Sequence, residues 1–418
     1  MNNIEPDKGR FVKTEAGKRL SQLLGTHYTN IHLKAQQGGF VVWVAIIVPI
    51  EIFSGFKDIV VVVPESHSAM CAGKGVGVQL AEKAEAIGYS MDLCSYARID
   101  IGAFTKEGRS LSPMHGLPRP DLIISNTNNC SLLAKWFDTY HRELGVPHLI
   151  LDVPFCYQPQ QAKDTDYILE QFKAIIEKIE EMTGQKWNPA LVQEAVQNTN
   201  LTHQYWKEYL AFAKHRPSGI TAFDTFVQMA PYINFRGDPR VTEHYKLLIE
   251  ETKDRVANGI FPVNPEKYRI LWDNIAPWHQ LHNMSERLKK LNANIVHATY
   301  TSCIGTIEGG FELYPYNGSD PLNYLARIQN LSVCPYGLQL REKAMSEIIE
   351  NIGIDGIVFA SNRSCKVYST MQMDLMRRIT EKHNIPAVMI EVDHADVRKY
   401  NEENAFVRVE AQIGRAHV

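Results

Sequence analysis

Hydrophobic residues form short runs in the first part of the chain, and similar runs return in the last part. The runs of the first part are residues 40–47, 59–63, 121–125 and 147–153. The runs of the last part are residues 268–272, 294–298, 356–361 and 386–392. Helical segments separate the runs, and this alternation is typical of βα units. The pattern therefore predicts two regions that each contain a mainly parallel sheet.

Between these regions the apolar residues take the spacing of an α-helix. From about residue 164 to 255 they recur every three or four positions opposite many Lys and Glu, as at Ile168, Phe172, Ile175, Ile176 and Ile179. We predict an α/β protein with two Rossmann-like domains, mainly parallel sheets and a helical insertion between them. The expected boundaries are residues 1–163, 164–265 and 266–411. Residues 412–418 fit neither a helix nor a strand pattern, and we interpret them as a non-native tail.

A weak internal repeat links the two predicted sheets. Residues 121–130 and 355–365 both spell a strand, a Ser-Asn loop and a cysteine, and each is followed by a helix and a second strand. The cysteines of the repeat are Cys130 and Cys365. Each lies just beyond the carboxyl end of a strand, which is where open α/β sheets bind ligands. We expect the two cysteines to face each other across a cleft between the domains.

Cys94 fits the same pattern, because residues 89–94 are expected to end a short strand before a helix that carries Arg98. Three thiolates on separate loops suit a metal or an iron–sulfur cluster, since deprotonated sulfur binds soft metals. Three cysteines would leave one iron of a [4Fe–4S] cluster open to a substrate oxygen. By spacing alone, an alternative in which these are scattered buried cysteines without a ligand is equally well supported. Packing is the default for the other four cysteines, which are Cys71, Cys156, Cys303 and Cys334.

Composition and charge limit the kinds of binding partner and the cellular compartment that we expect for this protein. The net charge is −3 over 418 residues, so neither a nucleic acid nor a membrane surface is an expected partner. The longest apolar run, residues 40–50, is shorter than the roughly 20 residues that cross a bilayer. The N-terminus has no signal-peptide pattern. We therefore expect a cytoplasmic protein whose seven cysteines stay reduced.

A glycine-rich stretch over residues 73–77 offers a rival interpretation. It resembles a phosphate-binding turn, and Asp92 stands where a ribose ligand would be expected. That arrangement would indicate a nucleotide-dependent oxidoreductase. Ten positions separate Val63 from Gly73, however, and the full glycine spacing is not met. Lys74 is followed by Gly75, so a Walker A loop is excluded as well.

Polar residues near the ends of the predicted strands supply further candidates. Glu51 follows the first apolar run, where a carboxylate could serve as general acid or base beside a thioester. It could equally be a helix-start carboxylate that the helix dipole stabilises. His67 and Ser68 are candidate substrate contacts, against the alternative that each is a satisfied loop or core residue.

Several short motifs occur in a specific order and spacing. They are Val-Pro-Ile-Glu51, residues 64–71 around His67, residues 94–98, residues 120–130, Asp-Val-Pro154 and residues 391–396. In these motifs, from about residue 38 to 411, the chain resembles the 2-hydroxyglutaryl-CoA dehydratase D-component family. That family includes subunits of 2-hydroxyacyl-CoA dehydratases and of benzoyl-CoA reductases. Its members usually continue through a closing helix, which the tail replaces here.

The resemblance implies a heterodimer of two related subunits, each with a [4Fe–4S] cluster on three cysteines. In this chain those are Cys94, Cys130 and Cys365, and Glu51 matches the family's substrate-side carboxylate. A separate ATP-hydrolysing activator protein would supply one electron, which turns the thioester carbonyl of an (R)-2-hydroxyacyl-CoA into a ketyl radical that expels the 2-hydroxyl. The product would be a 2-enoyl-CoA.

Two alternatives to this dehydratase remain. One is a benzoyl-CoA reductase-type subunit, which keeps the electrons in an aromatic ring and shares the same cysteines. The other is an electron-transfer protein that carries a cluster but performs no chemistry on a substrate.

Overall fold

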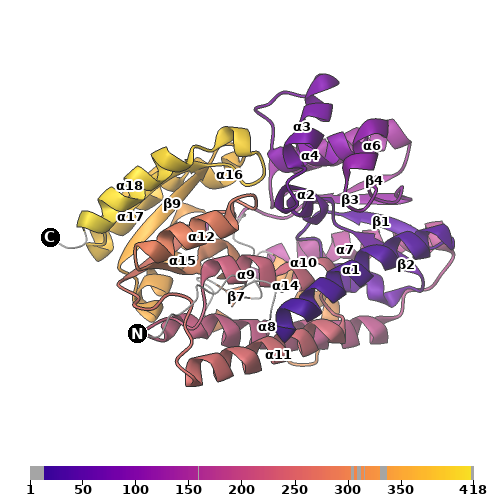
Figure 1. Cartoon of the computed structure of the whole chain (residues 1–418). Helices are drawn as coiled ribbons and strands as arrows, with labels where there is room; N and C mark the ends of the chain where they lie inside the picture. The colour runs from indigo at the N-terminus through magenta and orange to yellow at the C-terminus, as the bar shows by residue number, and fades with distance from the viewer. Residues whose placement is uncertain are drawn as a thin grey trace.

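Two four-stranded sheets form the two halves of the molecule. The structure is a computed structural model that describes residues 14–158, 160–302, 306–307, 312–314, 316–329 and 337–415. The N-terminal half, indigo to magenta, lies on the right in Figure 1, and the C-terminal half, orange to yellow, lies on the left. The long helices α8 and α11 run along the bottom of this view, beneath both halves (Figure 1).

The N-terminal sheet is parallel throughout, with strand order β2-β1-β3-β4. Its strands are β1 (Phe40–Val44), β2 (Ile59–Val62), β3 (Leu122–Asn126) and β4 (His148–Leu151). The helices of this half are α1 (Glu15–Gln36), η1 (Ile50–Gly55), α2 (Pro64–Gly73), α3 (Gly77–Ala86), α4 (Ser95–Phe104), α5 (Lys106–Leu111) and α6 (Ser131–Leu144). Every residue of β3 is buried, as expected for a parallel strand with helices on both faces.

The C-terminal sheet is also parallel, with strand order β10-β9-β5-β6. Its strands are β5 (Tyr268–Asp273), β6 (Ala293–Ala298), β9 (Gly356–Asn362) and β10 (Ala387–Val392). A separate antiparallel pair is formed by β7 (Thr306–Ile307) and β8 (Glu312–Leu313). The helices after β5 in the chain are α12 (Leu281–Lys290), α13 (Thr299–Ser302), α14 (Pro321–Gln329), α15 (Leu338–Ile352), α16 (Lys366–Ser369), α17 (Gln372–His383), η3 (Val397–Lys399) and α18 (Glu402–Arg415). Of these, α14 packs in the core of the N-terminal half.

The two sheets share one topology. When the second sheet is written from its other edge, as β6-β5-β9-β10, each strand matches one of β2-β1-β3-β4. Strand β9 therefore takes the place of β3, and β10 takes the place of β4. These are the strands of the internal repeat, so the repeat is confirmed in three dimensions. The structure also confirms the predicted α/β class with two Rossmann-like sheets.

A run of helices joins the two halves. It consists of α7 (Ala162–Thr183), α8 (Pro189–Leu210), η2 (Ala211–Lys214), α9 (Ala222–Gln228), α10 (Ala230–Phe235) and α11 (Pro239–Ala257). The apolar stripe predicted on the first of these helices is buried, from Ile168 to Ile179. The helices themselves were therefore predicted correctly, while the domain boundaries stay a prediction.

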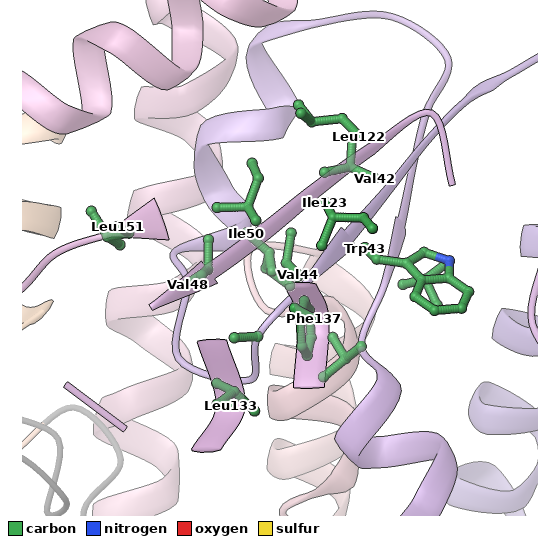
Figure 2. Close-up of a cluster of buried hydrophobic side chains, with 14 of the residues drawn as sticks. Val42, Trp43, Val44, Val48, Ile50, Leu122, Ile123, Leu133, Phe137 and Leu151 are labelled. Atoms are coloured by element: carbon green, nitrogen blue, oxygen red, sulfur yellow. The ribbon is translucent and has the colours of Figure 1, made fainter. Parts of the chain in front are cut away.

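Apolar side chains fill both halves. In the N-terminal half, Val42, Val44 and Ile123 of the sheet pack with Leu133 and Phe137 of α6 (Figure 2). In the C-terminal half, successive residues of β9 face two different clusters of buried residues, one on each side of the sheet. Burial on both faces explains why these strands read as continuous apolar runs.

Two local predictions were wrong. Residues 89–93 contain a turn and no strand, because Gly88 has a positive φ of 103° and the stretch Ser-Met-Asp that follows is exposed. Helix α18 extends to Arg415, so the first residues of the predicted tail are helical. No helix among the described residues is long and apolar enough to cross a membrane.

Candidate active site

Cys94, Cys130 and Cys365 line one partly open cavity of about 180 Å³, which we call the inner chamber. Each cysteine is the residue directly before a helix: Cys94 before α4, Cys130 before α6 and Cys365 before α16. Cys130 follows β3 and Cys365 follows the equivalent strand β9. The predicted meeting of these cysteines across the two halves is therefore what the structure contains.

Burial and the helix starts act in opposite directions on the pKa of the three thiols. The backbone N–H groups of Ala97 and Tyr96 lower the pKa of Cys94, those of Leu133 and Leu132 lower that of Cys130, and that of Tyr368 lowers that of Cys365. Burial nevertheless raises the pKa of all three thiols, that of Cys365 to about 12. The free cysteines are therefore protonated at neutral pH. Loss of these protons requires a positive group such as a metal centre, which binds sulfur in place of the proton.

His394 contacts Cys94 from the opposite half. Its Nε2 lies 3.7 Å from Cys94 Sγ and 2.9 Å from Ser95 Oγ. Its Nδ1 donates to Asn362 Oδ1 at 2.8 Å, at the end of β9. Burial lowers the pKa of His394 to about 4, so the ring is neutral at pH 7. His394 thus connects the loop of one cysteine to the strand that leads to another.

Asp393 strengthens the same connection. Ser95 Oγ donates to Asp393 Oδ1 at 2.8 Å, and Ser364 donates to Asp393 Oδ2. Ser95 follows Cys94, and Ser364 precedes Cys365. One carboxylate therefore holds the residues beside two of the three cysteines.

A charged network lies behind Cys94. The side chain of Arg98 is fully buried and pairs with Glu85 at 2.5 Å and with Asp396 at 3.0 Å. Arg398 pairs with the same two carboxylates. Burial opposes the charge on Asp396, but hydrogen bonds from Arg398 and Arg98 outweigh it and lower the pKa of Asp396 to about 2. This set of residues, the Arg98 network, joins α3 and α4 to the segment after β10.

Glu51 lies on the wall of the inner chamber, on η1 and not at the end of a strand. Its side chain is buried, with a relative exposure of 1%. Thr199 Oγ1 donates to Oε1 at 2.7 Å, and Arg236 Nε lies 3.3 Å from Oε2. Arg236 also donates to the carbonyl of Val48. The carboxylate is therefore held in one orientation at the chamber.

Glu65 lines the same chamber and was not predicted from the sequence. It lies in the first turn of α2, and its Oε1 accepts from the backbone N–H of Ile46 at 3.0 Å. Burial raises the pKa of Glu65 to about 8. The only sequence signal was its place just after β2, at the carboxyl edge of the sheet where the cysteines also gather.

A larger cavity of about 770 Å³, the outer chamber, adjoins the inner one. Side chains from α1, α2, α9, α11 and α12 line it. The residues that line both chambers are Ile46, Glu65, Tyr96, Met229, Ile233 and Tyr300. These residues form the neck between the two spaces. A ligand in the outer chamber can therefore extend one end towards the cysteines.

Within the ranges that the structure covers, no group of three or more His, Cys, Asp or Glu side chains is arranged to bind a single metal ion. The five cysteines described there are all free thiols. The chemistry that the site offers consists of three partly buried thiols, two buried glutamates and a guanidinium.

Comparison with known proteins decides the family. A family model described as 2-hydroxyglutaryl-CoA dehydratase, D-component, matches residues 45–413. The chain belongs to this family. It is 28% identical to the (R)-phenyllactyl-CoA dehydratase alpha subunit of Clostridium sporogenes, over 97% of this chain and 96% of that protein. It is 29% identical to the (R)-2-hydroxyisocaproyl-CoA dehydratase alpha subunit of Clostridioides difficile, over 96% of each chain.

A relative with a different named reaction also matches. A subunit of the benzoyl-CoA reductase of Thauera aromatica is 28% identical over 85% of this chain and 83% of that protein. The relatives of this chain therefore include both of the enzymes that the resemblance suggested. The relatives are named as subunits, and the dehydratases among them are hydro-lyases.

His67 and Ser68 line neither chamber of this D-component protein. His67 is buried between Ser112, at 2.8 Å, and Asp100, at 3.4 Å. Burial opposes its charge, but hydrogen bonds with Asp100 and Cys71 outweigh it and raise the pKa of His67 to about 9. Ser68 donates to the carbonyl of Tyr96 at 2.9 Å. Neither residue is among those that line the cavities, so both have the partners of core residues.

The glycine-rich stretch and the other four cysteines were also considered in the sequence, and the structure describes some of them. The glycine-rich stretch joins α2 to α3, so a helix and not a strand precedes it, and the context of a dinucleotide-binding turn is absent there. Cys71 and Cys156 are buried and line neither chamber. Cys303 and Cys334 lie outside the described residues.

Proposed function

We propose that this chain is the iron–sulfur subunit of a 2-hydroxyacyl-CoA dehydratase, which removes water from an (R)-2-hydroxyacyl-CoA to give a 2-enoyl-CoA. The observation that carries the proposal is the convergence of Cys94, Cys130 and Cys365 on one chamber. Family membership and the names of the dehydratase relatives support the same reaction.

The three cysteines suit a [4Fe–4S] cluster. In such a cluster each cysteine binds its own iron, so the site does not need three side chains around a single ion. The backbone N–H groups at each sulfur would stabilise the negative charge of bound thiolates. When bound, the cluster would supply one-electron chemistry and one iron without a cysteine, which acts as a Lewis acid.

The protein's own residues would bind and orient the substrate. The inner chamber would accommodate the acyl end, and the bound substrate would displace water from its largely apolar walls. Thr199 and Arg236 hold Glu51, which would accept a proton from the substrate as general base. The outer chamber would take the coenzyme A part, and Lys74 and Arg255 on its wall have the charge that phosphates require.

Partners and compartment belong to the same proposal. The relatives are each named as one subunit of an enzyme, which supports a second, related subunit in a heterodimer. An ATP-dependent iron–sulfur activator protein would deliver the electron that starts the reaction. Because ligation requires reduced thiols, we place the protein in the cytoplasm.

Cysteine substitutions test the cluster. We expect an anaerobic preparation to contain about four iron and four sulfide per chain. Replacing Cys94, Cys130 or Cys365 by Ser should abolish or convert the cluster, as seen in iron content and the visible spectrum. Cys156→Ser is the matched control, because Cys156 is buried but lines neither chamber. Full iron loading in the first three variants would refute the assignment.

A substrate screen separates the two reactions of the family. The chain, its partner subunit and the activator are given either a 2-hydroxyacyl-CoA or benzoyl-CoA. Dehydration without net electron consumption is the result we expect. Stoichiometric electron consumption with benzoyl-CoA would select the reductase, which the match to the benzoyl-CoA reductase relative keeps as the second candidate. Cluster loading without either reaction would favour an electron-transfer protein.

A further inference from the structure

Apolar side chains from two helices, α6 and α14, line one part of the inner chamber. They are Leu132, Leu133, Trp136, Leu325 and Ile328. All of them belong to the hydrophobic core of the N-terminal half or pack against it. None of them lines the outer chamber, so they lie beyond the neck that joins the two spaces. We call these residues the apolar floor of the inner chamber.

The polar residues of the inner chamber provide no unpaired cation for an acidic ligand. Arg236 is the one Lys or Arg among the described residues that line this chamber. Its guanidinium is already paired with the carboxylate of Glu51 at 3.3 Å. His394 also lines the chamber, but both of its ring nitrogens have partners, at Ser95 and Asn362.

These surroundings distinguish a charged ligand group from an apolar one. A carboxylate on the apolar floor would be repelled by Glu51 and would have no cation of its own, and an ionised group without a partner is very costly to remove from water. A hydrocarbon group gains from the same contact, because each buried CH₂ strengthens binding by about fourfold.

We propose that the apolar floor binds the side chain of the acyl group, and that the substrate carries an uncharged aliphatic or aromatic group there. The assignment rests on the proposed dehydration and narrows its substrate class. A 2-hydroxyacyl-CoA with a second carboxylate is then a poor substrate. Lys74 and Arg255 line only the outer chamber, so the anionic and the apolar parts of the substrate go to opposite sides of the neck.

Two CoA thioesters of nearly equal shape test the substrate class. (R)-2-Hydroxy-5-methylhexanoyl-CoA ends in an isopropyl group where (R)-2-hydroxyglutaryl-CoA ends in a carboxylate. The enzyme, iron-loaded and complete with its partner subunit and activator, should dehydrate the isopropyl compound with a kcat/KM higher by roughly 10²–10³-fold. Dissociation constants of the two compounds, measured without the activator, should show the same preference and do not depend on turnover.

Two substitutions at Ile328 test the floor itself. Ile328 is half-buried in α14, so Ile328→Lys would place a cation in the chamber. The preference for the isopropyl compound should then fall by roughly tenfold or more. Asn323→Lys is the matched control, because it adds the same charge to the same helix at a residue that lines neither chamber. Its preference should equal that of wild type.

Ile328→Ala keeps the floor uncharged if the lysine variant does not fold. It should weaken binding of the isopropyl compound several-fold and leave binding of the carboxylate compound unchanged. An unchanged preference in both folded Ile328 variants would overturn the assignment. So would a kcat/KM for the carboxylate compound equal to that for the isopropyl compound, while the proposed dehydration would stand. If wild type dehydrates neither compound, the proposed function fails, and equal dissociation constants would overturn the acyl assignment independently.

Discussion

Glu51 is held from two directions by residues far away in the sequence. Thr199 comes from α8, and Arg236 follows α10. The side chains that make Glu51 rigid are thus part of the helical run between the halves. Orientation of a catalytic carboxylate matters because proton transfer requires hydrogen-bond distance to the substrate.

A pair of substitutions separates the chemistry of Glu51 from its orientation. Glu51→Gln should lower turnover by roughly 10²–10⁴-fold, because an amide cannot accept the proton. Thr199→Val removes only a hydrogen bond to the carboxylate and should lower turnover by about tenfold, equivalent to roughly 1–1.5 kcal/mol. Steady-state rates of the iron-loaded enzyme are the measurement. Equal activity of Glu51→Gln and wild type would remove Glu51 from the mechanism.

Helix α4 owes its position to a missing side chain. A Cβ on Gly102 would lie 1.8 Å from the carbonyl oxygen of Leu80, so α3 and α4 approach more closely than any other residue would permit. Because Cys94 directly precedes α4, this approach also fixes one sulfur of the inner chamber.

Two glycine-to-alanine changes should therefore have opposite effects on stability. Gly102→Ala should lower the free energy of unfolding by about 1–3 kcal/mol or more, since backbone must move to admit the methyl group. It should also weaken iron retention by displacing Cys94. Gly25→Ala, in α1, meets no atom within 4 Å and should stabilise the chain by about 0.5–1 kcal/mol. Urea unfolding of both variants is the check, and equal midpoints would contradict the close approach.

At the scale of elements, the sequence pattern predicted the strands, and the strands in turn predicted where two of the cysteines lie. Apolar runs identify buried parallel strands, and the carboxyl-edge rule places Cys130 and Cys365. The segment before Cys94 contains a turn in place of the expected strand, because its polar residues Ser90 and Asp92 are exposed to solvent. His394 and Glu65 could not be assigned roles, since one depends on contacts across 300 residues and the other on the shape of a cavity.

At the scale of the molecule, the Arg98 network holds the two halves together. Glu85 and Arg98 belong to the N-terminal half, and Asp396 and Arg398 follow the last strand of the C-terminal half. Arg98 is fully buried, so removal of its positive charge would leave the carboxylates of Glu85 and Asp396 without one of their two cationic partners.

The network predicts a pH dependence of stability. The folded-state pKa of Asp396, about 2, is below its ordinary value, so its stabilising effect is complete above about pH 4 and is lost as the pH falls towards 2. Arg98→Met should lower the free energy of unfolding by about 3 kcal/mol at pH 7. The difference from wild type should shrink between pH 4 and 2. Arg142→Met, which breaks an exposed pair, should change little at any pH. A constant difference across this range would refute the assignment.

The origin of the three cysteines in two different sheets has a thermodynamic consequence. Any group that binds all of them is a crosslink between the halves, so its binding and the closure of the cleft are one linked equilibrium. A group present at a thousand times its dissociation constant would add about 4 kcal/mol to the closed form. By reciprocity, any interaction that separates the two halves lowers the affinity for that group. Release of such a group therefore depends on opening of the cleft as well as on the strength of its bonds to sulfur.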